Sequence, residues 1–222
     1  MTKDKREKKD NNLMIILLSG ILRGILRLYV YVAYRPKVIY ENKETKKFIR
    51  HNPVIFIPNH VSAQDGPVCY FLFSNSALMV AKDWYEKKWI RFAVYSRPAI
   101  SLDRRNLDTS WIKEAVAMIK SGKNVFIFPE GHTNKTGEID DFKAGFAMLS
   151  VMTGVPVVPM FINGEYNTVI GKRLKIYVGD PRELSSEGKG MNSVYLNGEC
   201  ERFKNIVVSM KNKYQNNLKS KQ

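Results

Sequence analysis

Short apolar runs rich in β-branched residues alternate along this chain with longer segments of helical periodicity. Strands are predicted at residues 54–57, 78–81, 99–102, 124–128, 156–162 and 174–178. Helices are predicted near residues 67–73, 84–95, 109–120, 143–152 and 194–215. In the third of these, Trp111, Ala115 and Ile119 recur at the spacing of a core-facing stripe. The alternation predicts an α/β domain with a largely parallel sheet flanked by helices, in which ligands bind near the carboxyl ends of the strands.

One longer apolar segment precedes this pattern. Residues 13–34 are mostly apolar and nominally long enough to span a bilayer, but Arg23 and Arg27 interrupt them. Each arginine costs roughly 2.5–3.5 kcal/mol at the centre of a spanning helix, which nearly cancels the gain of about 0.3–0.6 kcal/mol from each aliphatic residue. On a helix, one side carries the polar residues Ser19, Gly20, Arg23, Arg27 and Tyr34. This arrangement favours a helix that lies in the membrane interface.

These features predict how the chain is divided and where the protein is located in the cell. Residues 1–34 are expected to form a basic N-terminus and a membrane-anchoring helix, and residues 35–222 a folded domain. We expect a peripheral, monotopic attachment to the cytoplasmic face of the cell membrane. A single spanning helix is the alternative.

The charge of the chain indicates an anionic partner. The formal net charge is +15 at pH 7. Residues 35–50 carry six Lys or Arg against two Glu, and the tail after Phe203 carries five Lys and no acid. Both segments could contact anionic membrane lipids, although a purely solubilising role for the tail is an equal alternative. No nucleic-acid-binding motif is present, so nucleic acid is not an expected partner. Cys69 and Cys200 have no metal-ligand spacing, so we expect reduced thiols and predict no metal site.

The segment Asn59-His60-Val61-Ser62-Ala63-Gln64-Asp65 carries the clearest candidate chemistry. An imidazole can take the proton of a hydroxyl, and a carboxylate can fix its tautomer and stabilise the imidazolium. Residues five apart on a regular helix point about 140° apart, so His60 and Asp65 could meet only in a loop. Pro67 is well placed to begin the next helix near Gly66, which leaves that loop free. The alternative is a chance spacing in which Asp65 only caps the helix.

Three further blocks follow or form predicted strands, at residues 100–106, 128–132 and 155–159. Arg104 and Arg105 could clamp a phosphate through forked hydrogen bonds, or form a solvated turn paired with a neighbouring aspartate. Gly131 would allow the backbone to approach a ligand closely. Glu130 could hydrogen-bond a glycerol hydroxyl or brace its loop.

The order and spacing of the four blocks, from about Pro53 to Phe161, resemble those of the glycerophospholipid acyltransferase family, whose best-known bacterial members acylate lysophosphatidic acid. The resemblance implies phospholipid biosynthesis, with His60 as the general base and Asp65 as the group that orients it. It also implies that Arg104, and by a shorter match Lys82, bind the acceptor. The full set of candidate substrate-binding residues is Lys82, Arg104, Arg105, Glu130, Gly131 and Lys143. The co-substrate would be an acyl-CoA or an acyl carrier protein thioester, with no tightly bound cofactor.

The chain departs from the family after Glu130-Gly131. The family continues with Thr-Arg-Ser, whereas this chain has His132-Thr133-Asn134. Lys135 or Lys143 would have to supply the missing positive charge, and a lysine is a point charge rather than a fork. The departure keeps a second hypothesis open, an acyltransferase with a non-phosphate acceptor such as another lysolipid or an amino-lipid. A third hypothesis is a non-catalytic protein that binds a membrane surface or nucleic acid.

Overall fold

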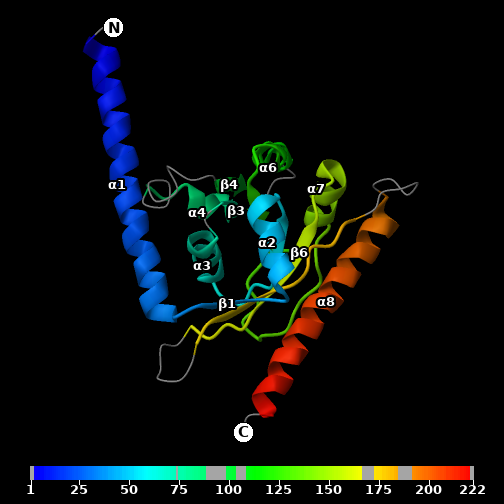
Figure 1. The fold of residues 1–222 in the computed structure, drawn as a ribbon. Helices are drawn as coiled ribbons and strands as arrows, with labels where there is room; N and C mark the ends of the chain where they lie inside the picture. The colour runs from blue at the N-terminus through cyan, green and yellow to red at the C-terminus, as the bar shows by residue number, and fades with distance from the viewer. Residues whose placement is uncertain are drawn as a thin grey trace.

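A seven-stranded sheet forms the centre of the computed structural model, which describes residues 3–73, 75–88, 99–103, 109–166, 173–184 and 192–220. The strands lie in the order β1-β7-β6-β2-β5-β3-β4. Their bounds are β1 Lys37–Tyr40, β2 Ile55–Pro58, β3 Ser76–Ala81, β4 Ala99–Leu102, β5 Asn124–Phe126, β6 Val157–Ile162 and β7 Lys175–Val178. The strands β6, β2, β5, β3 and β4 run parallel, β7 runs antiparallel to β6, and β1 is parallel to β7. The predicted α/β class with a largely parallel sheet is confirmed (Figure 1).

Helices cover both faces of this sheet. Their bounds are α1 Lys3–Tyr34, α2 Lys43–His51, α3 Asp65–Leu72, α4 Lys82–Tyr85, α6 Ser110–Lys120, α7 Gly145–Thr153 and α8 Ser193–Lys219. On one face, Phe56 of β2 packs in a core cluster that α1, α2 and α3 complete. On the other face, Ile55 and Ile57 pack with α6, α7 and α8. Alternate residues of β2 therefore enter opposite cores, as the continuous apolar run predicted.

The strand directions bring several chain segments to one edge of the sheet. The carboxyl ends of β6, β2, β5, β3 and β4 meet there because these strands are parallel. The amino ends of β1 and β7 lie at the same edge because this pair runs the opposite way. The end of α1, which directly precedes β1, therefore reaches the edge where His60, Glu130 and Lys82 leave their strands.

Two elements were absent from the sequence prediction. The short strand β1 and the helix α2 lie in the basic segment that we interpreted only as a charged surface. Asn42 caps α2 by accepting the N–H of Thr45 at 2.8 Å, and Ile49 packs into the core. The helix expected near residues 84–95 appears as the short α4, and its part from residue 89 onward lies outside the described residues.

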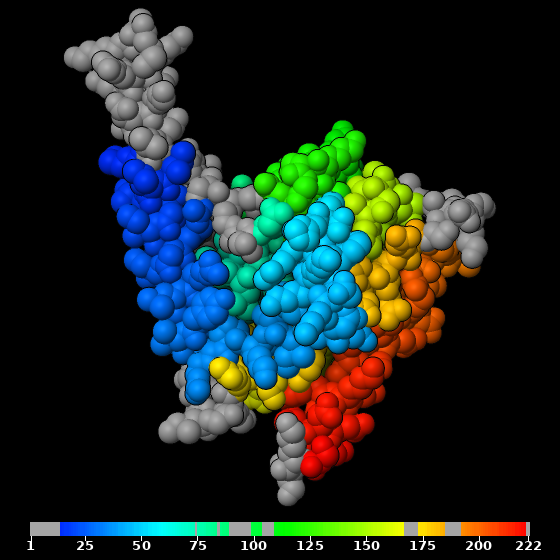
Figure 2. Space-filling view, in the orientation of Figure 1, coloured from blue at the N-terminus to red at the C-terminus, as the bar shows by residue number. Residues whose placement is uncertain are grey.

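The helix α1 presents an apolar surface to the outside. From Met14 to Tyr34 it has 21 residues with a mean hydropathy of 1.8, long and apolar enough to cross a membrane. Its exposed large side chains are Met14, Ile16, Leu17, Leu18, Ile21, Ile25, Leu28, Tyr29, Tyr31 and Val32. Val30 and Ser19 are buried, and the helix contacts α3. Figure 2 shows α1, in blue, along one side of the molecule. Of the residues expected on a common polar side, Arg23 and Tyr34 are half-buried, whereas Arg27 is exposed. Part of that side therefore faces the protein rather than water.

Candidate active site

His60 and Asp65 form a hydrogen-bonded pair at the carboxyl end of β2. Nδ1 of His60 lies 2.9 Å from Oδ2 of Asp65. The helix α3 begins at Asp65, so residues 59–64 form the loop that the sequence required for such a contact. The Asp65 side chain is completely buried, and that of His60 is 12% exposed. The pair is thus shielded while one edge of the ring remains accessible.

The surroundings of Asp65 fix the tautomer of the ring. Besides the ring, Oδ2 of Asp65 accepts the N–H groups of Val61 and Ser62, each at 2.8 Å. The carboxylate thus binds the loop before α3 as well as the ring. A carboxylate can only accept, so Nδ1 of His60 carries the proton and Nε2 of the neutral ring has its lone pair free. Nε2 is therefore the atom that could act as a base.

The backbone on either side of the ring is anchored to neighbouring strands. Asn59 is buried at the end of β2 and bonds across to β6 in both directions, accepting the N–H of Ile162 at 2.7 Å and donating to its carbonyl at 3.1 Å. The carbonyl of His60 accepts the N–H of Asn134 at 2.7 Å. These bonds hold His60 between β6 and the loop that follows β5.

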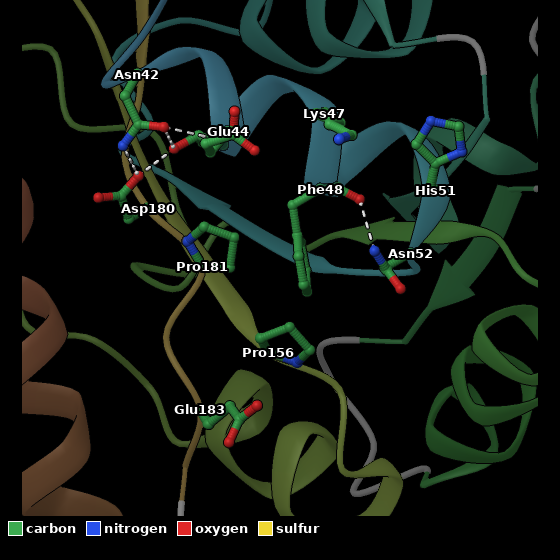
Figure 3. Close-up of a pocket in the computed structure, with 11 residues that line it drawn as sticks. Asn42, Glu44, Lys47, Phe48, His51, Asn52, Pro156, Asp180, Pro181 and Glu183 are labelled. Carbon is green, nitrogen blue, oxygen red and sulfur yellow. Dashed lines mark hydrogen bonds between the residues drawn. The ribbon is translucent and has the colours of Figure 1, made fainter.

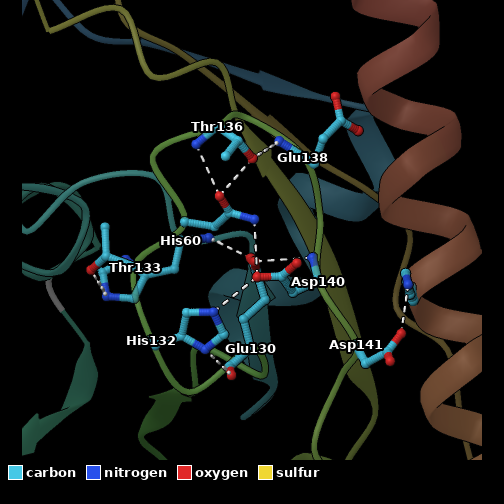
Figure 4. A network of polar contacts seen from close by, with 10 residues as sticks. His60, Glu130, His132, Thr133, Thr136, Glu138, Asp140 and Asp141 are labelled. Atoms are coloured by element: carbon cyan, nitrogen blue, oxygen red, sulfur yellow. Dashed lines mark hydrogen bonds and ion pairs between the residues drawn. The ribbon is translucent and has the colours of Figure 1, made fainter.

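Glu130 supplies the second anchor of His60 (Figure 4). Its Oε1 accepts the N–H of His60 at 2.8 Å, and its Oε2 accepts the N–H of Asp140 at 3.2 Å. Burial raises the pKa of this carboxyl above its ordinary value, and the two backbone N–H groups oppose that rise. Of the two roles considered for Glu130, the geometry supports the brace.

Two residues of the segment after β5 contact the His60 ring. The Phe128 ring stacks on the imidazole with centroids 4.2 Å apart. The hydroxyl of Thr133 lies 3.3 Å from Nε2. Thr133 occupies the position at which the family has arginine, so a neutral hydroxyl lies against the candidate base. A hydroxyl of the protein thus lies within hydrogen-bond distance of the atom that an acceptor hydroxyl would have to reach.

A second histidine–carboxylate contact closes the same loop. Nε2 of His132 lies 2.9 Å from Oδ2 of Asp140, which also accepts the side-chain amide of Asn134 at 2.9 Å. The other ring nitrogen of His132 lies 3.1 Å from the carbonyl oxygen of Glu130. These contacts stiffen the loop that carries Thr133 (Figure 4). In the described part of the chain, no group of three or more His, Cys, Asp or Glu side chains is placed to hold a metal ion.

The remaining candidate residues differ in what the structure shows of them. Lys143 lies across Gly131, whose φ is +75°: a Cβ added to this glycine would come within 2.7 Å of the lysine Nζ. Its ammonium group is therefore beside the Glu130–Thr133 turn. The Nζ of Lys82 lies 3.2 Å from Oδ2 of Asp103, at the ends of β3 and β4. Arg104 and Arg105 lie outside the described residues.

A separate cavity of about 670 Å³ lies at the opposite edge of the sheet (Figure 3). It is bordered by the segments that follow β1 and β7 and those that precede β2 and β6. Its lining residues are Asn42, Glu44, Thr45, Lys47, Phe48, His51, Asn52, Pro156, Asp180, Pro181 and Glu183. None of the candidate site residues lines it.

One partner of the pair was missed by the sequence analysis. Tyr166, in the segment after β6, donates its hydroxyl hydrogen bond to Oδ1 of Asp65. No sequence motif marks this tyrosine. Only its position gave a weak signal. Tyr166 lies four residues beyond the strand predicted at residues 156–162, and the carboxyl end of that strand was expected at the ligand-binding edge.

Comparisons with known proteins match these features. A family model described as Acyltransferase matches residues 37–163. The 1-acyl-sn-glycerol-3-phosphate acyltransferase of Cocos nucifera is 31% identical over 170 residues, which cover 70% of this chain and 54% of that protein. The protein of the same name from Borreliella burgdorferi is 25% identical over 151 residues, which cover 67% of this chain and 58% of that protein. This chain thus spans little more than half the length of these curated relatives.

Among solved structures, the fold is similar to that of the 1-acyl-sn-glycerophosphate acyltransferase from Thermotoga maritima. The TM-score is 0.59 at 21% sequence identity, and the match covers 95% of this chain and 84% of that one. At this level of identity the likeness concerns the fold.

Proposed function

The chain belongs to the acyltransferase family, and from that premise we propose that it moves a fatty acyl group from an acyl thioester to the free hydroxyl of lysophosphatidic acid. The observation that carries the proposal is the contact of 2.9 Å between His60 Nδ1 and the buried Asp65. It leaves Nε2 as an accessible base at the carboxyl edge of the sheet. The names of the relatives from Cocos nucifera and Borreliella burgdorferi support the same acceptor.

The proposed reaction is a direct transfer. Nε2 of His60 takes the proton of the acceptor hydroxyl while the hydroxyl oxygen attacks the thioester carbonyl carbon. Asp65 stabilises the imidazolium that forms. When the tetrahedral intermediate collapses, the C–S bond breaks, the sulfur leaves as a thiol with the proton returned from His60, and the new ester remains. The thioester is a co-substrate, and the scheme uses no tightly bound cofactor.

Basic side chains at the same edge would bind the acceptor phosphate. Lys143 is the best placed of the described ones, because its ammonium lies beside the turn that carries Thr133. No ion pair of Lys143 is found within the described residues, whereas Lys82 is paired with Asp103. The resemblance to the family adds Arg104 and Arg105 to this set. Glu130 and Gly131 shape the turn against which the glycerol part would lie.

Separate surfaces of the protein would bind the acyl-thioester donor and the membrane. The net charge of +15 suits both the phosphates of acyl-CoA and an acidic acyl carrier protein. The outward apolar side of α1 suits a monotopic attachment to the cytoplasmic face of the membrane, with a single spanning helix as the alternative. A lipid acceptor would then reach the site from the membrane.

A second candidate function is acyl transfer to an acceptor without a phosphate monoester, such as another lysolipid or an amino-lipid. The observation in its favour is the neutral Thr133 hydroxyl at 3.3 Å from the base, where the family has arginine. With less positive charge beside the base, lysophosphatidic acid would gain less binding free energy over acceptors with a larger or uncharged headgroup.

One assay separates these functions. The full-length protein in detergent micelles is given acyl-CoA or acyl carrier protein thioester together with lysophosphatidic acid, lysophosphatidylethanolamine or lysophosphatidylcholine, and the products are measured by mass spectrometry. We expect phosphatidic acid to form fastest, His60→Ala to remove the product, and His51→Ala, which alters an exposed histidine of α2, to retain it. Preference for another lysolipid would support the second candidate. Absence of transfer to every acceptor would favour a non-catalytic binding protein.

A further inference from the structure

Tyr166 satisfies the carboxylate oxygen of Asp65 that His60 does not use. Its hydroxyl bonds Oδ1, whereas the ring of His60 bonds Oδ2. Burial and the neighbouring Asp65 raise the pKa of Tyr166, so the hydroxyl remains protonated and is the donor. Asp65 is 0% exposed, so without this donor one oxygen of the carboxylate would be buried with no hydrogen-bond donor among the described residues.

A tight turn places Tyr166 beside α3. After β6 the backbone turns at Gly164, whose φ is +71°, and a Cβ at this glycine would lie 3.0 Å from Cγ2 of Val61. Any residue with a side chain would therefore be strained there. Asn163 fixes the start of the turn, because its Oδ1 accepts the N–H of Lys175 at 2.9 Å. The turn is thus pressed against the loop between His60 and Asp65.

The end of α1 supports the ring of Tyr166 from its other side. Tyr34, the last residue of α1, contacts Tyr166 edge to face, with centroids 5.2 Å apart and planes at 87°. Tyr29, which is 57% exposed, contacts Tyr34 in the same manner at 5.9 Å. Ring contacts therefore lead from the exposed side of α1, which runs beside α3 (Figure 1), to the carboxylate that orients His60.

We infer that Tyr166 is a positioning residue for the His60–Asp65 pair and that Tyr34 of the apolar N-terminal helix holds it in place. The inference rests on the proposed function. The titratable groups that face Tyr166 are Asp65 and Cys69 of α3 and Tyr34 of α1. Without the tyrosine hydroxyl, the carboxylate would rotate to satisfy Oδ1 elsewhere, and its bond to Nδ1 would lengthen. The position of α1 against the domain and the ability of His60 to act as a base are then linked through the side chain of Tyr166.

The first test removes only the hydroxyl. We expect Tyr166→Phe to lower kcat by at least about tenfold, the factor that corresponds to 1.36 kcal/mol, and to leave the KM values of donor and acceptor unchanged. Tyr177→Phe is the matched control, because it removes a hydroxyl from a partly buried tyrosine that packs on the opposite face of the sheet. A kcat equal to that of the wild type for Tyr166→Phe would overturn the inference.

The second test asks whether Tyr34 acts through Tyr166. Assays in detergent micelles remove the need for membrane binding. Tyr34→Leu should lower kcat less than Tyr166→Phe does, and the double variant should be no slower than Tyr166→Phe alone. Multiplied effects in the double variant would show that Tyr34 acts by another route and would overturn its assigned role.

A third measurement needs no catalytic activity. The proton between Nδ1 of His60 and Asp65 should give a low-field NMR signal, identified by its loss in His60→Ala. The chain contains only 3 histidines, which simplifies the assignment. We expect the signal to shift or broaden in Tyr166→Phe and to stay in place in Tyr177→Phe. An unmoved signal in Tyr166→Phe would overturn the positioning role, even if the wild type transferred no acyl group and the proposed function failed.

Discussion

Glu130 and His60 are joined through the backbone of the histidine rather than through its ring. The carboxylate accepts the His60 N–H at 2.8 Å with one oxygen and the Asp140 N–H at 3.2 Å with the other. A buried carboxylate with both oxygens engaged by backbone donors links the end of β2 to the loop after β5. Glu130 therefore fixes the position of the His60 imidazole without contacting the ring.

Replacement of this brace should affect stability and turnover together. In Glu130→Gln a single amide oxygen remains, so an NH₂ group faces one of the two backbone donors. An unpaired buried donor costs about 1–3 kcal/mol, partly offset here by the loss of a buried charge. We expect a lower Tm by scanning fluorimetry and a lower kcat. If Glu130 bound the acceptor hydroxyl instead, the variant would raise the acceptor KM and keep the Tm of the wild type.

The same variant should show a defined pH dependence. Burial raises the pKa of Glu130 in the folded protein. Such a carboxyl contributes stability that is present below its unfolded pKa of about 4.3 and is lost as the pH rises through the folded value. Glutamine does not ionise, so the deficit of Glu130→Gln against the wild type should be larger near about pH 4 than near about pH 7. Denaturant titrations at both pH values measure it, and a deficit that grows with pH would contradict the argument.

The sheet and the His60–Asp65 contact could be predicted because their signals are local. The apolar run Val54–Ile57 is buried on both faces of the sheet, so every residue in it is hydrophobic. The loop between His60 and Asp65 followed from helix geometry and from Pro67, and α3 begins one residue before the predicted position. The resemblance to the acyltransferase family is confirmed by the match over residues 37–163.

The contacts of Tyr166 and Thr133 could not be predicted because they depend on strand order. Tyr166 meets Asp65 across 101 positions, since β6 lies beside β2 in the sheet. Thr133 meets His60 across 73 positions by way of β5 on the other side. Nothing in the local sequence states which strands are neighbours. The roles of Lys82, Arg104 and Arg105 in substrate binding stay predictions.

The orienting carboxylate gives a test of the base. Asp65→Asn presents a neutral amide to Nδ1 and no longer stabilises the imidazolium. We expect kcat to fall by a factor of about 10²–10⁴, the range typical of general-base assistance. Asp141→Asn is the matched control, because Asp141 is exposed and pairs with Lys204 on α8. Steady-state kinetics are measured on both variants. A kcat of Asp65→Asn equal to that of the wild type would exclude Asp65 from the proton transfer.

The outward side of α1 should hold the protein on lipid. Ile21 and Ile25 are 61% and 59% exposed. A double change of both to Glu would place two charges on the side expected to face acyl chains. We expect the variant to be lost from floated anionic liposomes. Val194→Glu, at an 82% exposed position on α8, should float like the wild type. Unchanged flotation of the α1 variant would place the main attachment elsewhere.

Acceptor choice should depend on the charge beside Thr133. Lys143 extends across Gly131 toward this turn. Its side chain is exposed, so its bond to a phosphate monoester should contribute about 1.5 kcal/mol, the lower end for a charged hydrogen bond. Lys143→Ala should therefore raise the KM for lysophosphatidic acid by roughly tenfold. Lys120→Ala is the control, because Lys120 is an exposed lysine in the last turn of α6.

Thr133→Arg tests the same site by adding charge. A guanidinium fork next to Nε2 of His60 should bind a phosphate monoester more strongly than a hydroxyl does. The preference for lysophosphatidic acid over lysophosphatidylcholine should then increase, although removal of the Thr133 hydroxyl from its place 3.3 Å from the base also changes kcat. Competition assays with both acceptors in one mixture cancel that common factor. If neither Lys143→Ala nor Thr133→Arg alters the ratio of products, this loop does not select the headgroup, and Lys82 and Arg104 become the positions that must do so.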